Sequence, residues 1–166
     1  MHMPKAEVSL PGDSTVLVTR SFNAPRELVW EAYTTPELVR RWLLGPPGWT
    51  MPVCEMDVRV GGKYRWVWRS ETDGSQFGFH GTFQEVDPPA RIVNVEIYDP
   101  GDVGGSMGEG GECLVTVTLT ESGGITTLAT LMDFGSKEAR DAAVSTGMTE
   151  GMEASYQNLD RVLSQG

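Results

Sequence analysis

The sequence predicts an α+β domain that combines one antiparallel sheet with a long C-terminal helix. Three observations predict this class. Segments typical of strands dominate the middle of the chain, two short helical segments follow the first strand, and an amphipathic helical pattern begins at Ser136. With 166 residues, 39% of them hydrophobic, the chain suits one domain with one core. We expect a disordered N-terminal tail over residues 1–13 and a single domain over residues 14–166.

The first strand is followed by two short helices. Thr15–Phe22 alternates apolar and β-branched residues and is typical of a strand, which Asn23-Ala24-Pro25 ends. Pro25 and Pro36 each suit the first turn of a helix, because that position needs no backbone N–H donor. Thr35 can cap the second helix. Apolar residues recur at helical spacing after each proline, which predicts two consecutive helices.

Six further segments carry residues that favour strands, bounded by Gly, Pro, Asp or Ser. Most of the turns between them are short, such as Gly61-Gly62, Asp73-Gly74 and Gly123-Gly124. Because a parallel crossover needs about a dozen or more residues, neighbouring strands must be antiparallel. With Thr15–Phe22 they give a sheet of about seven strands. The six segments are Met51–Val58, Lys63–Arg69, Gln76–Val86, Arg91–Tyr98, Glu112–Thr120 and Ile125–Phe134.

The C-terminal segment has the pattern of an amphipathic helix. Ser136 can cap Lys137–Val144. Beyond it, large apolar residues recur at steps of three and four, so they share one helical face. That face consists of Met148, Met152, Tyr156, Leu159 and Leu163.

The charge balance argues against binding of polyanions. Lys and Arg total 13 against 23 Asp and Glu, which gives a formal net charge of −10. A field of this sign repels phosphate backbones and anionic membrane surfaces. No apolar run reaches the roughly 18 residues that span a bilayer. We therefore expect neither nucleic acid nor a membrane as a partner.

The two cysteines, Cys54 and Cys113, belong to no metal-binding motif. Neither is part of a C-x-x-C pair, and the histidines form no cluster with zinc or iron spacing. Asp99–Glu112 is glycine-rich but lacks the ending of a phosphate-binding loop and carries acidic residues. Met1–Gly12 lacks the regions of a signal peptide. We expect a cytoplasmic protein with reduced thiols, no metal and no cofactor.

Four groups of short strings follow one another between Phe22 and Ile92, and the order of the predicted elements extends the pattern over nearly the whole chain. They are Phe22-Asn23-Ala24-Pro25 with Val29-Trp30-Glu31-Ala32, Pro36-Glu37 followed by Trp42, Gly61-Gly62-Lys63-Tyr64, and Gly81-Thr82-Phe83-Gln84-Glu85-Val86-Asp87-Pro88-Pro89-Ala90-Arg91-Ile92. In this combination the chain resembles the START-like (SRPBCC) superfamily, and within it the branch named for the activator of heat-shock-protein ATPase. The strings are also explained as helix starts and turns, so the resemblance predicts a fold and not a reaction.

The resemblance implies a helix-grip fold, in which a curved antiparallel sheet wraps around the C-terminal helix. In proteins of this kind the first strand lies beside the last, and ligands bind between the concave face of the sheet and that helix. The resemblance also brings two partner hypotheses, a homodimer and a chaperone, and with the chaperone a role in the stress response.

Side-chain alternation predicts which residues would face such a cavity. Tyr64, Trp66 and Trp68 share one face of their strand. An aromatic and methionine-rich lining suits a small, mostly apolar or amphipathic ligand, because methionine adapts to varied shapes and Tyr or Trp offers one polar atom. The same residues could instead fill an ordinary core. The predicted ligand-binding residues are Trp42, Trp49, Tyr64, Trp66, Trp68, Phe79, Glu96, Tyr98, Met132, Met148, Met152 and Tyr156.

Three polar residues are candidates for chemistry. Glu96 and Tyr98 share a strand face with Asn94, and that face points either into the cavity or to solvent. A buried Glu96 would have a raised pKa and could act as general acid or base in a cyclase, dehydratase or hydrolase. His80 alternates out of phase with the phenylalanines of its strand, so we expect it to face away from them. Nothing in the spacing completes a triad with it.

The sequence thus leaves three functions open. Binding of a small, mostly apolar molecule in an internal cavity is the favoured hypothesis, and a cavity-based enzyme and a chaperone-associated interaction protein are the alternatives. No residue is assigned a catalytic role. The long Asp99–Glu112 segment is either an inert connection or a lid, with Met107 over the cavity mouth.

Overall fold

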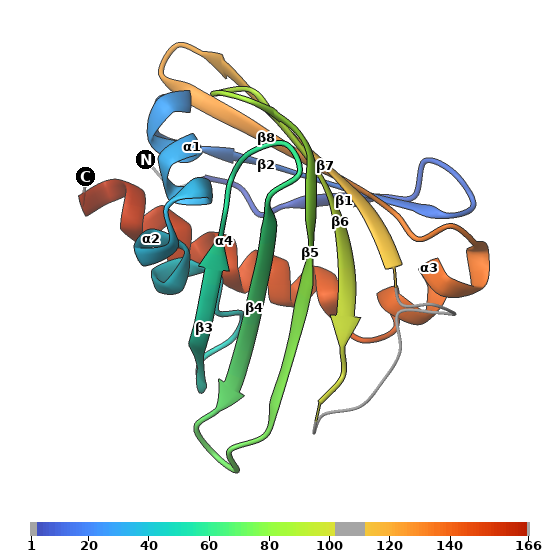
Figure 1. Cartoon of the computed structure of the whole chain (residues 1–166). Helices are drawn as coiled ribbons and strands as arrows, with labels where there is room; N and C mark the ends of the chain where they lie inside the picture. The colour runs from blue at the N-terminus through green and yellow to red at the C-terminus, as the bar shows by residue number, and fades with distance from the viewer. Residues whose placement is uncertain (1–2, 102–111, 166) are drawn as a thin grey trace.

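The computed structural model of the chain describes residues 3–101 and 112–165. Within them, one antiparallel sheet contains eight strands in the order β1-β2-β8-β7-β6-β5-β4-β3. The sheet curves around helix α4, and α1 and α2 cover one end of it (Figure 1). The strands are β1 (Glu7–Ser9), β2 (Thr15–Phe22), β3 (Trp49–Met56), β4 (Lys63–Ser70), β5 (Gln76–Asp87), β6 (Arg91–Asp99), β7 (Glu112–Ser122) and β8 (Ile125–Asp133), and the helices are α1 (Arg26–Thr34), α2 (Pro36–Trp42), α3 (Lys137–Val144) and α4 (Met148–Gln165).

The predicted α+β helix-grip fold is confirmed. The first long strand, β2, pairs with the last, β8, and the remaining strands follow one another as an antiparallel meander. Pro36 occupies the first turn of α2, as predicted. Thr35 occupies the N-cap position of that helix, but its side chain makes no capping hydrogen bond.

The N-terminal segment differs from the disordered tail predicted over residues 1–13. Glu7–Ser9 forms the short edge strand β1 and pairs with β2, so the sheet has eight strands in the described residues and not seven. The N–H of Ala6 also donates a hydrogen bond to Glu153 Oε1 of α4 at 2.8 Å. Three residues are too few to show a strand alternation in the sequence. Their strand conformation depends on contacts with distant parts of the chain.

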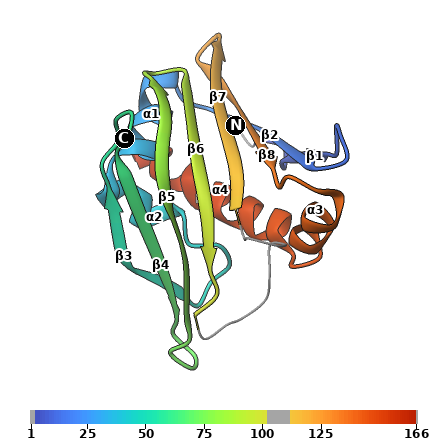
Figure 2. The same cartoon turned by 45° about the vertical axis from the view of Figure 1, so that its right-hand side comes forward.

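The C-terminal helical segment is divided in two. Ser136 caps α3 as predicted, because its Oγ accepts a hydrogen bond from the N–H of Ala139 at 3.1 Å. Gly147, with a φ of 83°, separates α3 from α4 in a conformation that favours glycine. Helix α4 then crosses one face of the sheet (Figure 2). The predicted single helical run therefore becomes a short helix and a long one.

The core packs α1, α2 and the C-terminal half of α4 against the sheet. Trp42 and Leu159 are almost completely buried there, and the Trp42 indole donates to the carbonyl of Ala32 at 2.9 Å. The ring of Tyr156 lies 5.6 Å from Phe22 and 6.5 Å from Trp42. The inner face of this half of α4 is therefore held by close packing.

A buried ion cluster ties α4 to β2. Arg20 is only 3% exposed, and its guanidinium donates hydrogen bonds to Glu153 at 3.1 and 3.2 Å and to Asp160 at 2.8 and 2.9 Å. It also lies 5.0 Å from the centre of the Phe22 ring, within reach of a cation–π interaction. Burial by itself raises the pKa of Glu153, but hydrogen bonds from Arg20 and the Ala6 N–H outweigh it, and the net pKa is lowered. We call these three charged residues the Arg20 cluster.

Candidate ligand-binding cavity

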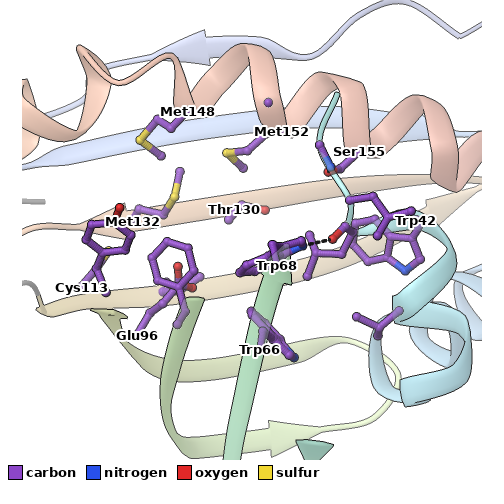
Figure 3. A pocket seen from close by; sticks show the side chains of 18 of the residues that line it. Trp42, Trp66, Trp68, Glu96, Cys113, Thr130, Met132, Met148, Met152 and Ser155 are labelled. Atoms are coloured by element: carbon purple, nitrogen blue, oxygen red, sulfur yellow. Dashed lines mark hydrogen bonds between the residues drawn. The ribbon is translucent and has the colours of Figure 1, made fainter. Parts of the chain in front are cut away.

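A cavity of about 620 Å³ lies between the concave face of the sheet and α4. Strands β3 to β8, the helices and the loop that follows α2 all contribute to its wall. Figure 3 shows Met148 and Met152 projecting from α4 across the cavity from Trp68 and Glu96. The volume lies within the range of several hundred Å³ that is typical of ligand sites.

Every predicted ligand-binding residue except Tyr64 lines this cavity. The strand alternation on β4 and β6 and the helical spacing on α4 therefore identified the correct faces. Glu96 and Tyr98, whose face was left open between cavity and solvent, point into the cavity. The lining residues that were predicted are Trp42, Trp49, Trp66, Trp68, Phe79, Glu96, Tyr98, Met132, Met148, Met152 and Tyr156.

Tyr64 lies on the concave face but is covered, so the sequence placed it in the lining incorrectly. Its ring packs 4.7 Å from the ring of Trp66, and only 3% of its surface is exposed. Its hydroxyl donates to the carbonyl of Val95 at 2.7 Å and accepts from Asn94 Nδ2 at 2.9 Å. The ring reaches this position by crossing over Gly81, which has no side chain. Alternation gives the face of a residue but not what covers it.

Six aromatic side chains form one side of the cavity, which we call the aromatic wall. The wall follows from the strand register: Trp66 is paired with Phe79, and Phe79 with Tyr98. Ring centroids of Phe79 and Tyr98 are 5.3 Å apart. The Trp68 indole donates to the carbonyl of Leu43 at 2.6 Å, which fixes its orientation. The aromatic wall consists of Trp49, Trp66, Trp68, Phe77, Phe79 and Tyr98.

Glu96 introduces one carboxyl group into this apolar surrounding. It lies on β6 between Gly81 of β5 and Cys113 of β7, which are its partners in the sheet. Burial raises the pKa of Glu96 to about 7. The side chain keeps part of its accessible surface because it faces the cavity, while the surrounding protein removes it from bulk water. A carboxyl group in this state can donate or accept a proton near neutral pH.

Sequence reasoning missed a group of small and aliphatic lining residues. On β7 and β8 they alternate in phase with Met132, and on α4 Gly151 lies three residues after Met148 on the same face. The alternation on these strands is visible in the sequence, but small and aliphatic side chains are equally typical of an ordinary core, so they do not by themselves indicate a cavity. The missed residues on these elements include Cys113, Val115, Val117, Thr130, Gly151 and Ser155.

His80 lies outside the cavity, as predicted. Its Nδ1 is 2.8 Å from Asp99 Oδ2, and 44% of its side chain is exposed. It therefore cannot contact a ligand in the cavity. The Asp99–Glu112 segment, predicted to be either an inert connection or a lid with Met107, includes residues 102–111, which lie outside the described residues.

In residues 3–101 and 112–165, no group of three or more His, Cys, Asp or Glu side chains could hold a metal ion. No helix in the same part of the chain is long and apolar enough to cross a membrane.

Glu96 should make folding stability depend on pH. Below about pH 4.5 the carboxyl is protonated in both the folded and the unfolded chain, and between that pH and about 7 only the unfolded chain ionises. The free energy of unfolding should therefore fall as the pH rises through this window, by about 2 kcal/mol. Glu96→Gln should lose this dependence. Urea unfolding at about pH 5 and pH 8 measures it.

The matched control for this prediction is Glu55→Gln, which changes the net charge equally at an exposed position of β3. It should keep the pH dependence of the wild type. An equal slope in wild type and Glu96→Gln would show that Glu96 titrates normally.

Comparison with known proteins places the chain in a family. Residues 23–164 match the family described as "Activator of Hsp90 ATPase homolog 1-like protein". The chain belongs to this family. A protein from Rhodobacter sphaeroides is 32% identical, with a TM-score of 0.87 over 98% of this chain and 100% of its own. This confirms the family that the sequence strings resembled.

Other solved structures share the fold of this AHSA1-like chain at lower identity. Protein Ms6760 from Mycobacterium smegmatis is 23% identical, with a TM-score of 0.81 over 96% of this chain and 97% of its own. A protein from Arthrobacter aurescens is 25% identical, with a TM-score of 0.80 over 96% and 92%. A search of curated proteins gave no match.

Proposed function

We propose that this AHSA1-like protein binds a small, mostly apolar or amphipathic molecule in the cavity between the sheet and α4. The observation that supports this proposal is the cavity of about 620 Å³ with its aromatic wall on one side and Met148 and Met152 on the other. Protein interiors are close-packed and hold few voids larger than a water molecule. Side chains that only filled a core would not leave such a space.

The first experiment is native mass spectrometry of the protein purified without added ligand. A retained molecule would identify the chemical class directly. Thermal-shift screening against small apolar compounds is the second step, because a ligand that binds only the folded state raises stability by mass action.

A larger side chain at Gly151 of α4 would fill part of the cavity and so test whether ligands bind there. It lines the cavity, lies inside a helix, and a Cβ built on it would meet no atom within 4 Å. Gly151→Phe should therefore place its ring in the cavity, keep the fold, and weaken binding of any screening hit by at least about tenfold. Isothermal titration calorimetry measures the loss.

Gly151→Ala is the matched control, because it adds one methyl group and leaves most of the volume free. It should bind the hit like the wild type, and it should stabilise the protein by about 0.5–1 kcal/mol because alanine favours a helix over glycine. Unchanged binding in a folded Gly151→Phe variant would locate the site outside the cavity.

Glu96 supports a second candidate function, general acid–base catalysis on the bound molecule. Its pKa of about 7 is near the value that favours proton transfer at neutral pH. Once a ligand is identified, turnover by the wild type and its loss in Glu96→Gln would support an enzyme. Binding without turnover in both would support a carrier or sensor.

The name of the family supports a third candidate, activation of an Hsp90 ATPase. This role would use the surface of the protein, so Gly151→Phe should leave it intact. A steady-state ATPase assay of Hsp90 with wild-type and variant protein tests it. No increase in ATP hydrolysis with either protein would count against this candidate.

A further inference from the structure

The formally charged side chain in the described lining of the cavity is acidic. Its lining, as far as the chain is described, contains no Lys, Arg or His, and Glu96 is its single acidic residue. The other titratable lining groups are phenols and the Cys113 thiol. Burial raises the pKa of Tyr98, of Tyr156 and of the Cys113 thiol, and neighbouring Glu96 raises that of Cys113 further. These groups stay neutral near pH 7, so Glu96 alone can give the cavity a net charge.

The position of Glu96 relative to the aromatic wall matters for recognition. Tyr98 follows Glu96 by two residues on β6 and faces the same side, and Phe79 is the partner of Tyr98 on β5. Trp66 extends the same row on β4. A group held at the Glu96 carboxylate therefore lies at the border of a row of aromatic rings. The negative face of such rings attracts cations, most strongly where water is excluded.

Within the part of the chain that the structure describes, the Glu96 carboxylate has no hydrogen-bonding partner of its own, and two polar side chains near it already bond elsewhere. The hydroxyl of Tyr64 and the amide of Asn94 are already hydrogen-bonded to each other, and the hydroxyl also bonds to Val95. Among the described residues, no hydrogen bond or ion pair to the Glu96 carboxylate is found. A carboxylate that faces an apolar cavity, away from bulk water and without a partner, is costly, and a ligand that supplies a cationic donor would reduce that cost.

We propose that the cavity selects an apolar amine, whose protonated nitrogen pairs with the Glu96 carboxylate while its apolar body lies along the aromatic wall. This inference rests on the proposed function and names its ligand class. An apolar carboxylic acid of the same size would place a second negative charge beside Glu96 and would find no cation in the described lining. The net charge of −10 also favours the approach of cations over anions.

The test uses three probes with one apolar skeleton: naphthylethylamine, naphthylethanol and naphthylacetic acid. Calorimetric titration at about pH 8, where Glu96 is ionised, gives the affinity of each for the wild-type protein. The amine is expected to bind at least about tenfold more tightly than the alcohol, and the acid more weakly than both. Glu96→Gln should remove the preference for the amine and leave the affinity for the alcohol within about twofold.

Glu55→Gln is the control, since it removes the same charge from the exposed face of β3. It should keep the preference, whereas a general field effect would reduce it equally. Binding of the alcohol and the amine with equal affinity would overturn this inference and leave the cavity function standing. Tighter binding of the alcohol below about pH 6, where Glu96 is protonated, than of the amine at pH 8 would also overturn it, because Glu96 would then act as a neutral donor. Binding of none of the three would overturn the cavity function itself.

Discussion

Replacing Gly81 with alanine is expected to destabilise the protein by about 4 kcal/mol. A Cβ at this position would lie 1.7 Å from the carbonyl oxygen of Val95 and 2.9 Å from the hydroxyl of Tyr64. The nearer atom belongs to the backbone of β6, which cannot rotate away, so the pairing of β5 with β6 must change. The hydrogen bonds of the Tyr64 hydroxyl would be lost as well, each worth about 1 kcal/mol. Urea unfolding measures the loss.

A Tyr64→Phe background separates the two contacts. If the backbone contact dominates, removing the hydroxyl should restore less than about 1 kcal/mol of the loss caused by Gly81→Ala. A full rescue would assign the effect to the hydroxyl alone. A Gly81→Ala variant as stable as the wild type would contradict the close approach of β5 and β6.

Replacing Arg20 with methionine is expected to cost about 3 kcal/mol. Methionine keeps the apolar part of the side chain, but Glu153 and Asp160 lose the partner that compensates their partial burial. Breaking a buried ion pair from one side costs about 3–5 kcal/mol, and the lower value applies because 34% of the Asp160 side chain is exposed. Thermal unfolding and urea unfolding at about pH 7 measure the effect.

The control replaces the whole Arg20 cluster, combining Arg20→Met with Glu153→Gln and Asp160→Asn. Neutral side chains of similar size remove the uncompensated charges, so the triple variant should recover most of the stability. Acidification offers an independent check. The lowered pKa of Glu153 contributes stability above about pH 4.5, which is lost as the pH falls through its folded value. Arg20→Met should lack this contribution.

Much of the fold could be predicted because its local patterns agree with its topology. The alternation of Thr15–Phe22, the proline at the start of α2 and the Ser136 cap each indicate one element, and each is present. Strand β1 could not be predicted in this way, since three residues carry too little pattern and its order depends on β2 and Glu153. Local sequence indicates the longer strands and the helices, whereas the short edge strand β1 depends on contacts with distant parts of the chain.

The sequence predicted which strand faces line the cavity, but not which side chains on those faces are covered by their neighbours. Period-two alternation placed Trp66, Trp68 and Glu96 on the concave side. It could not show that Tyr64 is buried against the rings of Trp66 and Phe83, because burial behind a neighbour depends on how the rings are packed. The Arg20 cluster could not be predicted either, because the partners of Arg20 are 133 and 140 residues away and no spacing in the sequence pairs them.

The residues that mark the family are largely separate from those that line the cavity. Of the strings between Phe22 and Ile92, only Trp42, Phe83 and Ile92 contribute to the lining. The residues that start helices and form turns are therefore mostly different from the residues that a ligand in the cavity would contact. A protein with the same helix starts and turns but other wall residues could therefore keep this fold and recognise another molecule.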